Sequence, residues 1–194
     1  FLATVQKDNI DKFMQFIIDK KYSVSKRTLL SLTCFPDNEA IQDINFALNE
    51  ISVSRKETTS MITIETYLND EYLNSYWADG LIIATPTGTT GYSMSCGGPI
   101  LTPDVKSIVI TPIAPHNLNA RPLVVPDETE IRLKVSSRDD HYMVSLDSRI
   151  ISVKNETVLL IKKSPFEINM VEIPEKTFLK TLRNKLFWGE DRRN

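Results

Sequence analysis

The feature that most constrains the fold of this chain is a long succession of short apolar segments separated by polar or turn-forming residues. Residues 130–135 alternate cleanly, with Ile131, Leu133 and Val135 on one face, as in a half-buried β-strand. Such segments recur at intervals of about ten residues, and no helical pattern alternates with them. The sequence therefore predicts a mainly β, sandwich-like core rather than a parallel doubly wound sheet. The predicted strands are residues 27–35, 46–53, 61–68, 71–77, 81–84, 107–113, 130–135, 142–146, 150–153, 157–162 and 166–173.

One helix is predicted near each end of the chain. Over residues 9–22, apolar side chains recur at positions i, i+3, i+4, i+7 and i+8, and Asp8 or Asn9 can cap the helix. Residues 178–186 show a second helical stripe, and Gly189 is a typical stop signal. The expected chain is thus β-rich, with an N-proximal and a C-terminal helix.

Composition and charge exclude several classes of protein. The chain has 194 residues, enough for one large domain, and its net charge of −2 provides no basic surface for nucleic acid or membranes. The apolar runs are far too short to cross a bilayer, and no signal peptide is recognisable at Phe1. Cys34 and Cys96 stand apart, and with His116 and His141 they give neither a disulfide framework nor a zinc pattern. We expect a globular cytoplasmic protein that binds neither nucleic acid nor membranes.

The loop after the predicted strand 81–84 points to ligand binding. Pro86 and Gly88 end the strand, and four threonines crowd into residues 85–90. Small residues let a ligand approach the backbone closely, and free N–H groups at a helix start can hold phosphate oxygens. The ring and hydroxyl of Tyr92 suit a nucleoside. The residues alone leave open a surface turn whose hydroxyls bond only its own backbone, and they contain neither a Walker loop nor a GxGxxG fingerprint.

This loop resembles a long motif of the NAD kinase family. Residues 79–100 read DGLIIATPTGTTGYSMSCGGPI and are similar to the family pattern DGxxxxTPTGSTAYxxSxGGPI. Thr89 stands where Ser is usual and Gly91 where Ala is usual, and both replacements keep the side chain small. Four further segments resemble family motifs: LNE at 48–50, TPIAPHNLNARP at 111–122, VSLDSR at 144–149 and FL at 1–2.

The resemblance implies an enzyme that transfers a phosphoryl group from ATP, or from polyphosphate, to the 2′-hydroxyl of the adenosine ribose of NAD. Asn49 and Glu50 would then face the adenosine half of NAD, where an amide and a carboxylate can meet the adenine edge and ribose hydroxyls. The resemblance implies further NAD-binding positions in this chain: Thr90, Gly91 and Tyr92 around the adenosine, Asp79, Ser95 and Ala114 around the nicotinamide, Asp147 and Arg149 close to the ligand, and also Thr87.

Each of these residues also has a purely structural interpretation. Asn49 and Glu50 can simply be exposed residues at a strand end, and Asp79 can form a turn with Gly80. Ser95 and Ala114 can be a helix-surface hydroxyl and a packing residue. Arg149 either offsets phosphate charge or is solvated at a hairpin end. His116, between two prolines, is interpreted as a structural hydrogen-bonding residue and not as a catalytic base.

The family's general base is absent from these residues. In the family it is the Asp of a GGDG loop, and no GGDG occurs in the 194 residues, which begin at Phe1 without an initiator methionine. We therefore expect a fragment with residues 1–175 as the NAD-binding domain and 176–194 as a helical tail that packs on a missing N-terminal α/β domain. Such a fragment would bind NAD or NADP without catalysis. The full-length enzyme would use ATP with Mg²⁺ or another divalent cation, and its nicotinamide pocket, shared between subunits, implies a homodimer or homotetramer.

Two other functions stay open. One is a non-catalytic NAD(P)-binding regulatory module. The other is a related lipid kinase, which shares the two-domain architecture but not the combination of the Asn49-Glu50 pair with this loop. A Rossmann dehydrogenase is disfavoured, because the glycine fingerprint and the βαβ rhythm are both missing.

Overall fold

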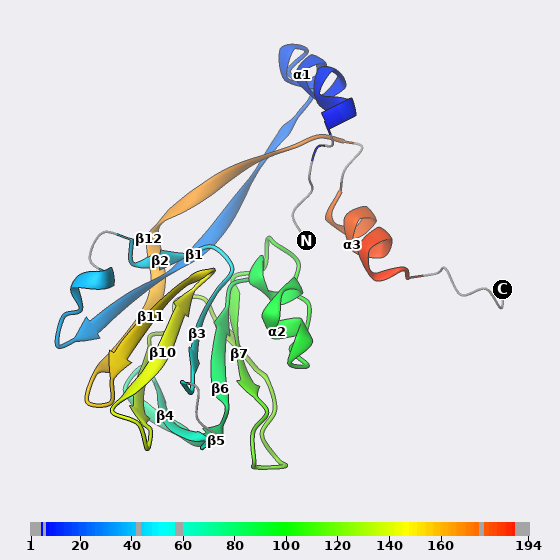
Figure 1. The fold of residues 1–194 in the computed structure, drawn as a ribbon. Coiled ribbons are helices and arrows are strands. Elements are labelled where there is room, and N and C mark those ends of the chain that lie inside the picture. Colours follow the sequence, from blue (N-terminus) through cyan, green and yellow to red (C-terminus); the bar gives the residue numbers. More distant parts are fainter. Residues whose placement is uncertain (1–4, 6, 42–43, 57–59, 175–176, 189–194) are drawn as a thin grey trace.

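The computed structural model describes residues 5, 7–41, 44–56, 60–174 and 177–188. Two six-stranded sheets, in which every strand pairing is antiparallel, form the body of the molecule (Figure 1). The expected mainly β fold is confirmed.

The first sheet joins both halves of the chain. Its strand order is β2-β1-β12-β9-β4-β5, so the first long strand pairs with the last one. The strands are β1 (Ser23–Phe35), β2 (Phe46–Ala47), β4 (Ile62–Leu68), β5 (Glu71–Ala78), β9 (Ile131–Ser136) and β12 (Val158–Glu172).

The second sheet carries the central strand of the protein. Its order is β11-β10-β3-β6-β7-β8. All five residues of β6 (Gly80–Ala84) are buried, as its unbroken apolar pattern predicts. The other strands are β3 (Glu50–Ser54), β7 (Ser107–Ile113), β8 (Leu123–Pro126), β10 (His141–Leu146) and β11 (Arg149–Lys154).

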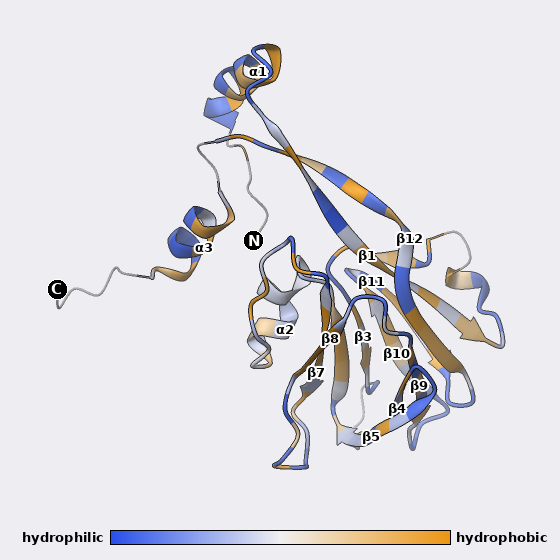
Figure 2. Cartoon of the chain, turned by 180° about the vertical axis from the view of Figure 1, so that it is seen from behind, coloured by the Kyte–Doolittle hydropathy of each residue, from blue (hydrophilic) through white to orange (hydrophobic). Residues whose placement is uncertain are grey.

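The core lies between the two sheets. Alternate residues of β4 and β9, such as Ile64 and Leu133, join Ile51 and Leu81 of the second sheet in one buried apolar cluster. Figure 2 shows hydrophobic colours along the strands and hydrophilic colours on many connecting loops. Burying one such aliphatic side chain contributes about 1.5–3 kcal/mol, so this cluster holds the two sheets together.

A long two-stranded arm extends beyond the body (Figure 1). The arm is the outer part of β1 and β12, paired from Ser23↔Glu172 inward to a register shift between Thr28 and Leu30. At its tip lie η1 (Lys7–Asn9) and α1 (Ile10–Ile18), neither of which has a buried residue. The other described helices are η2 (Glu39–Ile41), η3 (Gly88–Thr90), α2 (Tyr92–Ser95) and α3 (Phe178–Leu186).

Three strand predictions differ from the structure. The predicted strand 46–53 is wrong as one element, because the chain leaves the first sheet after β2 and enters the second as β3. The segments 157–162 and 166–173 form one strand, β12. Pro165 is tolerated inside it because it lies at the register shift, where no regular ladder bond is required. The edge strand β8 was not predicted, since it is short and ends in Pro126.

Both predicted helices are present in the structure, with different bounds for the first. The first helix is shorter than the expected 9–22, and the left-handed Lys20 (φ 55°) follows it. Asn9 occupies the N-cap position, but its side chain makes no capping bond. The second helix is found as α3, where the Thr177 hydroxyl accepts from the Lys180 N–H and the left-handed Phe187 ends the helix. Gly189 lies outside the described residues. No described helix is long and apolar enough to cross a membrane.

Candidate functional site

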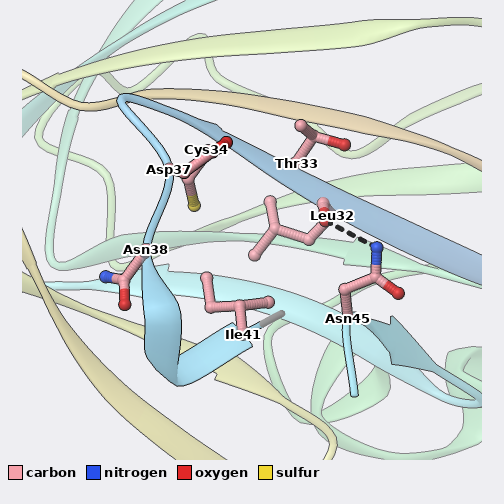
Figure 3. Close-up of a pocket in the computed structure, with 7 residues that line it drawn as sticks. All are labelled: Leu32, Thr33, Cys34, Asp37, Asn38, Ile41 and Asn45. Atoms are coloured by element: carbon pink, nitrogen blue, oxygen red, sulfur yellow. Dashed lines mark hydrogen bonds between the residues drawn. The ribbon is translucent and has the colours of Figure 1, made fainter. Parts of the chain in front are cut away.

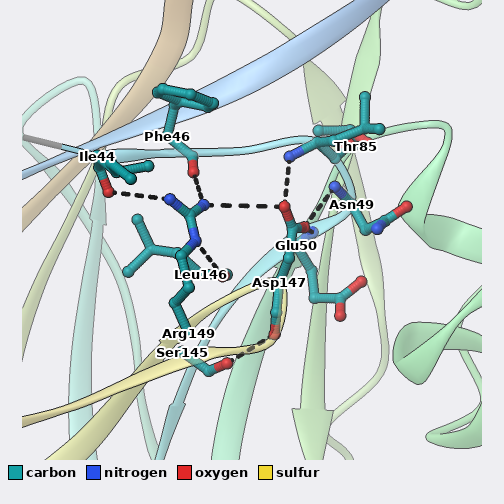
Figure 4. Close-up of polar contacts among 10 residues, drawn as sticks. Ile44, Phe46, Asn49, Glu50, Thr85, Ser145, Leu146, Asp147 and Arg149 are labelled. Carbon is teal, nitrogen blue, oxygen red and sulfur yellow. Dashed lines mark hydrogen bonds and ion pairs between the residues drawn. The ribbon is translucent and has the colours of Figure 1, made fainter.

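Two segments singled out by their motifs meet at one end of the second sheet. Strand β3 pairs with β6 in the register Glu50↔Ala84, so residues 48–49 lie beside the start of the loop that follows β6. The Thr85 N–H donates to the Asn49 carbonyl at 2.8 Å, and the Thr85 hydroxyl donates to the Leu48 carbonyl at 2.6 Å. Figure 4 shows this junction with the Asp147 turn beside it.

Gly88 lies directly against this junction. A Cβ built on Gly88 would meet the Asn49 carbonyl oxygen at 2.0 Å and the Asn49 Cα at 2.8 Å, so only glycine fits there. The small residues of the loop were predicted to let a ligand approach. At Gly88 the close approach is made by the protein's own backbone, and it locks the loop onto the Asn49 segment.

Three of the four threonine hydroxyls in the loop bond to the protein itself, and of these only that of Thr90 belongs to a predicted NAD-binding residue. Thr89 donates to the Pro86 carbonyl at 2.7 Å and accepts from the Leu101 N–H at 3.0 Å. The Thr90 hydroxyl donates to the Thr87 carbonyl at 3.3 Å. The loop therefore makes the internal bonds that the structural interpretation anticipated, and its outer surface is left to Gly91 and Tyr92, which are exposed.

Asp147 organises the facing segment. Its Oδ1 accepts the Asn49 N–H at 2.7 Å and the Glu50 N–H at 3.2 Å, and its Oδ2 accepts the Leu48 N–H at 2.9 Å. Asp147 sits in the turn between β10 and β11 with a left-handed φ of 54°, a conformation that Asp adopts more readily than most residues. The prediction that Asp147 lies close to a ligand is not tested by these contacts, which are made with the protein itself.

Arg149 is bonded to the same stretch of chain. Its guanidinium donates to the carbonyls of Ile44 at 3.2 Å, Phe46 and Leu146, the last at 3.2 Å. The group also lies 5.5 Å from the centroid of the Phe46 ring and 3.9 Å from Asp147 Oδ2. Arg149 thus has a structural role in the described contacts, and its predicted interaction with phosphate stays a prediction.

Glu50 is the unsatisfied member of the site. Its Oε2 atom is buried and has no hydrogen-bond partner among the described residues. The same atom lies 3.6 Å from the position that a Cβ would take on Gly91. Burial, and after it the nearby charge of Asp147, raises the pKa of the Glu50 carboxyl to about 7. A buried acceptor that lacks a donor is a group that a ligand hydroxyl can satisfy.

The positions expected around a nicotinamide come from the adjoining edge of β6 and β7. The Asp79 N–H donates to the Ile113 carbonyl at 3.0 Å, which brings Asp79 next to Ala114. The pKa of the Tyr92 hydroxyl is raised mainly by burial, and to a smaller extent by the charges of Cys96 and Asp79. Ala114 and Ser95 are exposed, and their contact with a nicotinamide stays a prediction.

Two contributors were missed from sequence. Arg55 forms an ion pair with Asp79 at 3.0 Å, and Thr85 joins the two halves of the site. No local pattern marks Arg55, whereas Thr85 lies inside the motif and could have been included. The His116 ring lies against the Trp77 ring, with centroids 4.4 Å apart and planes inclined by 45°, and the backbone N–H of His116 donates to the Trp77 carbonyl.

A separate small cavity lies away from this site (Figure 3). It has a volume of about 210 Å³ and lies between the end of β1 and η2. Burial and the charge of Asp37 raise the pKa of the Cys34 thiol to about 11, so this thiol stays protonated. The lining residues are Leu32, Thr33, Cys34, Asp37, Asn38, Ile41 and Asn45.

Comparison with known proteins identifies the family. The family model described as the ATP-NAD kinase C-terminal domain matches residues 48–173, which begin at the Leu48-Asn49-Glu50 segment and include the whole of the site. The chain belongs to this family. Its full length is 75% identical to the NAD kinase of Flavobacterium psychrophilum and 73% identical to that of Flavobacterium johnsoniae. In both cases the chain spans 66% of the relative's length.

Solved structures of the NAD kinase fold agree. Yeast NADH kinase complexed with NADH superimposes with a TM-score of 0.88 at 25% identity, over 98% of this chain and 58% of that one. An NAD kinase from Archaeoglobus fulgidus in complex with ATP superimposes with a TM-score of 0.77 at 26% identity, over 93% of this chain and 66% of that one. The fold of this chain is thus shared with both of these structures.

Proposed function

We propose that this chain is the NAD-binding part of an NAD kinase, which phosphorylates the 2′-hydroxyl of the adenosine ribose of NAD with ATP as donor. The observation that carries the proposal is the buried, unpartnered Oε2 of Glu50 beside Gly91. Ribose hydroxyls are donors, and a carboxylate accepts them strongly. The relatives named NAD kinase and the yeast structure complexed with NADH support this choice of ligand.

The remaining residues complete the dinucleotide site on this proposal. The amide of Asn49 reads the adenine edge, and the ring of Tyr92 covers the adenosine with Thr87, Thr90 and Gly91 beneath it. Asp79, Ser95 and Ala114 hold the nicotinamide end. Asp79 can accept from the carboxamide NH₂ while its ion pair with Arg55 orients the carboxylate.

Phosphoryl transfer itself needs groups beyond those described. The described residues contain no group of three or more His, Cys, Asp or Glu side chains that could hold a metal ion. No GGDG segment occurs among the 194 residues. We infer that the 194-residue chain binds NAD and that the transfer step depends on parts of the whole protein outside this chain.

Other aspects of the whole protein are proposed on the same basis. We propose a cytoplasmic homodimer or homotetramer with NAD and ATP as its small-molecule partners. The tail that contains α3 would then pack against the further domain of the whole protein. This helix exposes Leu179, and Phe187 and Trp188 follow it as exposed residues, which gives it an apolar surface for such a contact.

An assay of NADP⁺ formation with ATP and Mg²⁺ tests the proposal. The 194-residue chain and a protein extended to the length of the Flavobacterium relatives are compared under the same conditions. We expect turnover by the extended protein and none by the shorter chain. Turnover by the shorter chain would contradict the inference that phosphoryl transfer depends on parts of the protein outside this chain. Lack of turnover by the extended protein would favour a regulatory NAD-binding module.

A further inference from the structure

We propose that Asp147 is a positioning residue of the dinucleotide site, which directs the side chains of Asn49 and Glu50 by holding their backbone and does not contact the ligand itself. The inference rests on the proposed function, because it assigns a role within the NAD site. It changes the interpretation of Asp147 from a ligand-proximal group to the support on which the ligand-binding pair is built.

The hydrogen bonds of Asp147 carry this assignment. Three consecutive N–H groups, those of Leu48, Asn49 and Glu50, converge on its carboxylate at 2.7–3.2 Å. Successive N–H groups that surround one anion form a nest, and bonds to an ionised acceptor are stronger than neutral ones. The contact is reciprocated, since the Asp147 N–H donates to the Glu50 carbonyl at 3.0 Å. Both carboxylate oxygens are therefore turned toward the protein's own chain.

The topology explains why this support is required. Leu48 and Asn49 lie where the chain crosses from β2 in the first sheet to β3 in the second, so neither residue belongs to a strand. Their carbonyls are held by Thr85 on one side, and their N–H groups are held by Asp147 on the other. These two partners hold the backbone of Asn49 and thus set the direction in which its side chain leaves the chain.

Arg149 extends the support to the preceding residues. Its guanidinium holds the carbonyls of Ile44 and Phe46, and it lies 3.9 Å from Asp147 Oδ2 (Figure 4). The turn between β10 and β11 thus contacts the crossing segment from residue 44 to residue 50. A single turn of the second sheet sets the geometry of the segment that enters it.

Asp147 also influences the protonation of Glu50. The pH dependence of NAD binding can therefore distinguish a positioning role of Asp147 from a purely structural one. After burial, the Asp147 charge is the influence that raises the pKa of Glu50. Ala84 and Gly91, which face Glu50 from β6 and from the loop, are uncharged. If ribose hydroxyls bind the ionised carboxylate, the affinity for NAD rises with pH until Glu50 is fully ionised. Removing the Asp147 charge moves this rise to lower pH.

The test is a series of NAD titrations by calorimetry between about pH 5.5 and 8.5 on wild type and Asp147→Asn. Asparagine accepts the left-handed backbone and preserves the shape, but its NH₂ group cannot accept the Leu48 N–H. We expect affinity at pH 8 to fall at least about tenfold and the pH midpoint of binding to move to lower pH. Asp140→Asn, at the exposed start of the same hairpin, is the matched control and should match wild type in both respects.

The outcomes separate this inference from the proposed function. Absence of NAD binding by the wild type would overturn the proposed function. Wild-type binding together with an unchanged affinity and pH midpoint in Asp147→Asn would overturn the positioning role alone. If Asp147→Asn does not fold, amide hydrogen exchange of the wild type tests the positioning role of Asp147 instead. Protected amides at Leu48, Asn49 and Glu50 support the role, and exchange of all three at unprotected rates overturns it.

Discussion

The ionised Glu50 carboxyl lowers the stability of the fold, because its Oε2 atom is buried without a hydrogen-bond partner among the described residues. Such a cost is expected of a carboxyl that serves ligand binding. Its pKa is about 7 in the folded chain against an ordinary value of 4.5, so between these pH values the folded state binds the proton more tightly than the unfolded state does. The contribution of Glu50 to the free energy of unfolding is therefore full below about pH 4.5 and is lost as pH rises through 7. At about 1.4 kcal/mol for each factor of ten in proton affinity, the loss is at most roughly 3 kcal/mol.

Glu50→Gln should separate stability from binding. The neutral amide is free of the cost of burying a charge, so we expect the variant to be more stable than wild type at pH 8 by about 1–3 kcal/mol. The melting temperature should rise by roughly 2–4 °C for each kcal/mol. At pH 5 the difference should shrink, and NAD affinity should fall at both pH values. Melting curves at pH 5 and 8 check this, and a lower melting temperature for the variant at pH 8 would contradict it.

Gly88 tests the contact between the loop and the Asn49 segment. Gly88→Ala places a Cβ within 2.0 Å of the Asn49 carbonyl oxygen, and backbone atoms on both sides cannot move aside locally. We expect a loss of about 1–3 kcal/mol or more in urea unfolding. Gly91→Ala is the matched control, because its nearest contact would be 3.2 Å, to the Gly88 carbonyl oxygen. Equal losses for the two variants would show that the loop is not locked onto Asn49.

The long antiparallel pair of strands β1 and β12 joins the two ends of the chain, and a buried charge lies on it. Arg27 on β1 is 6% exposed, and its Nη2 donates to Glu172 of β12 at 2.6 Å. Its Nε is buried and has no hydrogen-bond partner among the described residues. The Arg27–Glu172 ion pair therefore supports this part of the arm, because a buried guanidinium without a partner is strongly unfavourable.

Glu172→Ala should weaken the pairing of β1 with β12 and lower the free energy of unfolding. Breaking a fully buried pair costs about 3–5 kcal/mol. The Glu172 side chain is 31% exposed, so we expect a loss nearer 2 kcal/mol. Glu167→Ala is a matched control on the same strand, since its pair with Lys26 is exposed at 3.5 Å and should contribute less than about 1 kcal/mol. Urea unfolding of both variants measures the difference, and similar losses would contradict the account.

The elements show how far sequence patterns reach. Strands such as β9, whose apolar residues alternate, were predicted within a residue or two because period-two burial is a local property. The crossing at Leu48-Asn49 could not be predicted, because Phe46 and Ile51 are equally apolar and nothing local assigns them to different sheets. The motifs predict Asn49, Glu50 and Asp147 as site positions. They did not reveal that the Asp147 carboxylate faces the backbone, which depends on how β3 and β10 pair.

At the scale of the whole molecule, the two sheets form a common core that brings distant segments to one site. Residues 48–50, 79–92 and 147–149 come together because β3 lies between β6 and β10 in the second sheet. The two-stranded arm and the helix α1 at its tip stand apart from this core (Figure 1), and α1 has no buried residue. The proposed binding site therefore lies within residues 48–149, and we expect the chain to bind NAD without the rest of the protein.

Calorimetric titration of NAD into the 194-residue chain tests this central claim most directly. We expect saturable binding at one site per chain. Asn49→Ala and Tyr92→Ala should each weaken it by about tenfold or more while the melting temperature changes little, because both side chains lie outside the apolar core. Tyr72→Ala, an exposed tyrosine on the edge strand of the other sheet, is the control and should bind as wild type. Absence of saturable binding, or an equal loss in all three variants, would contradict the account.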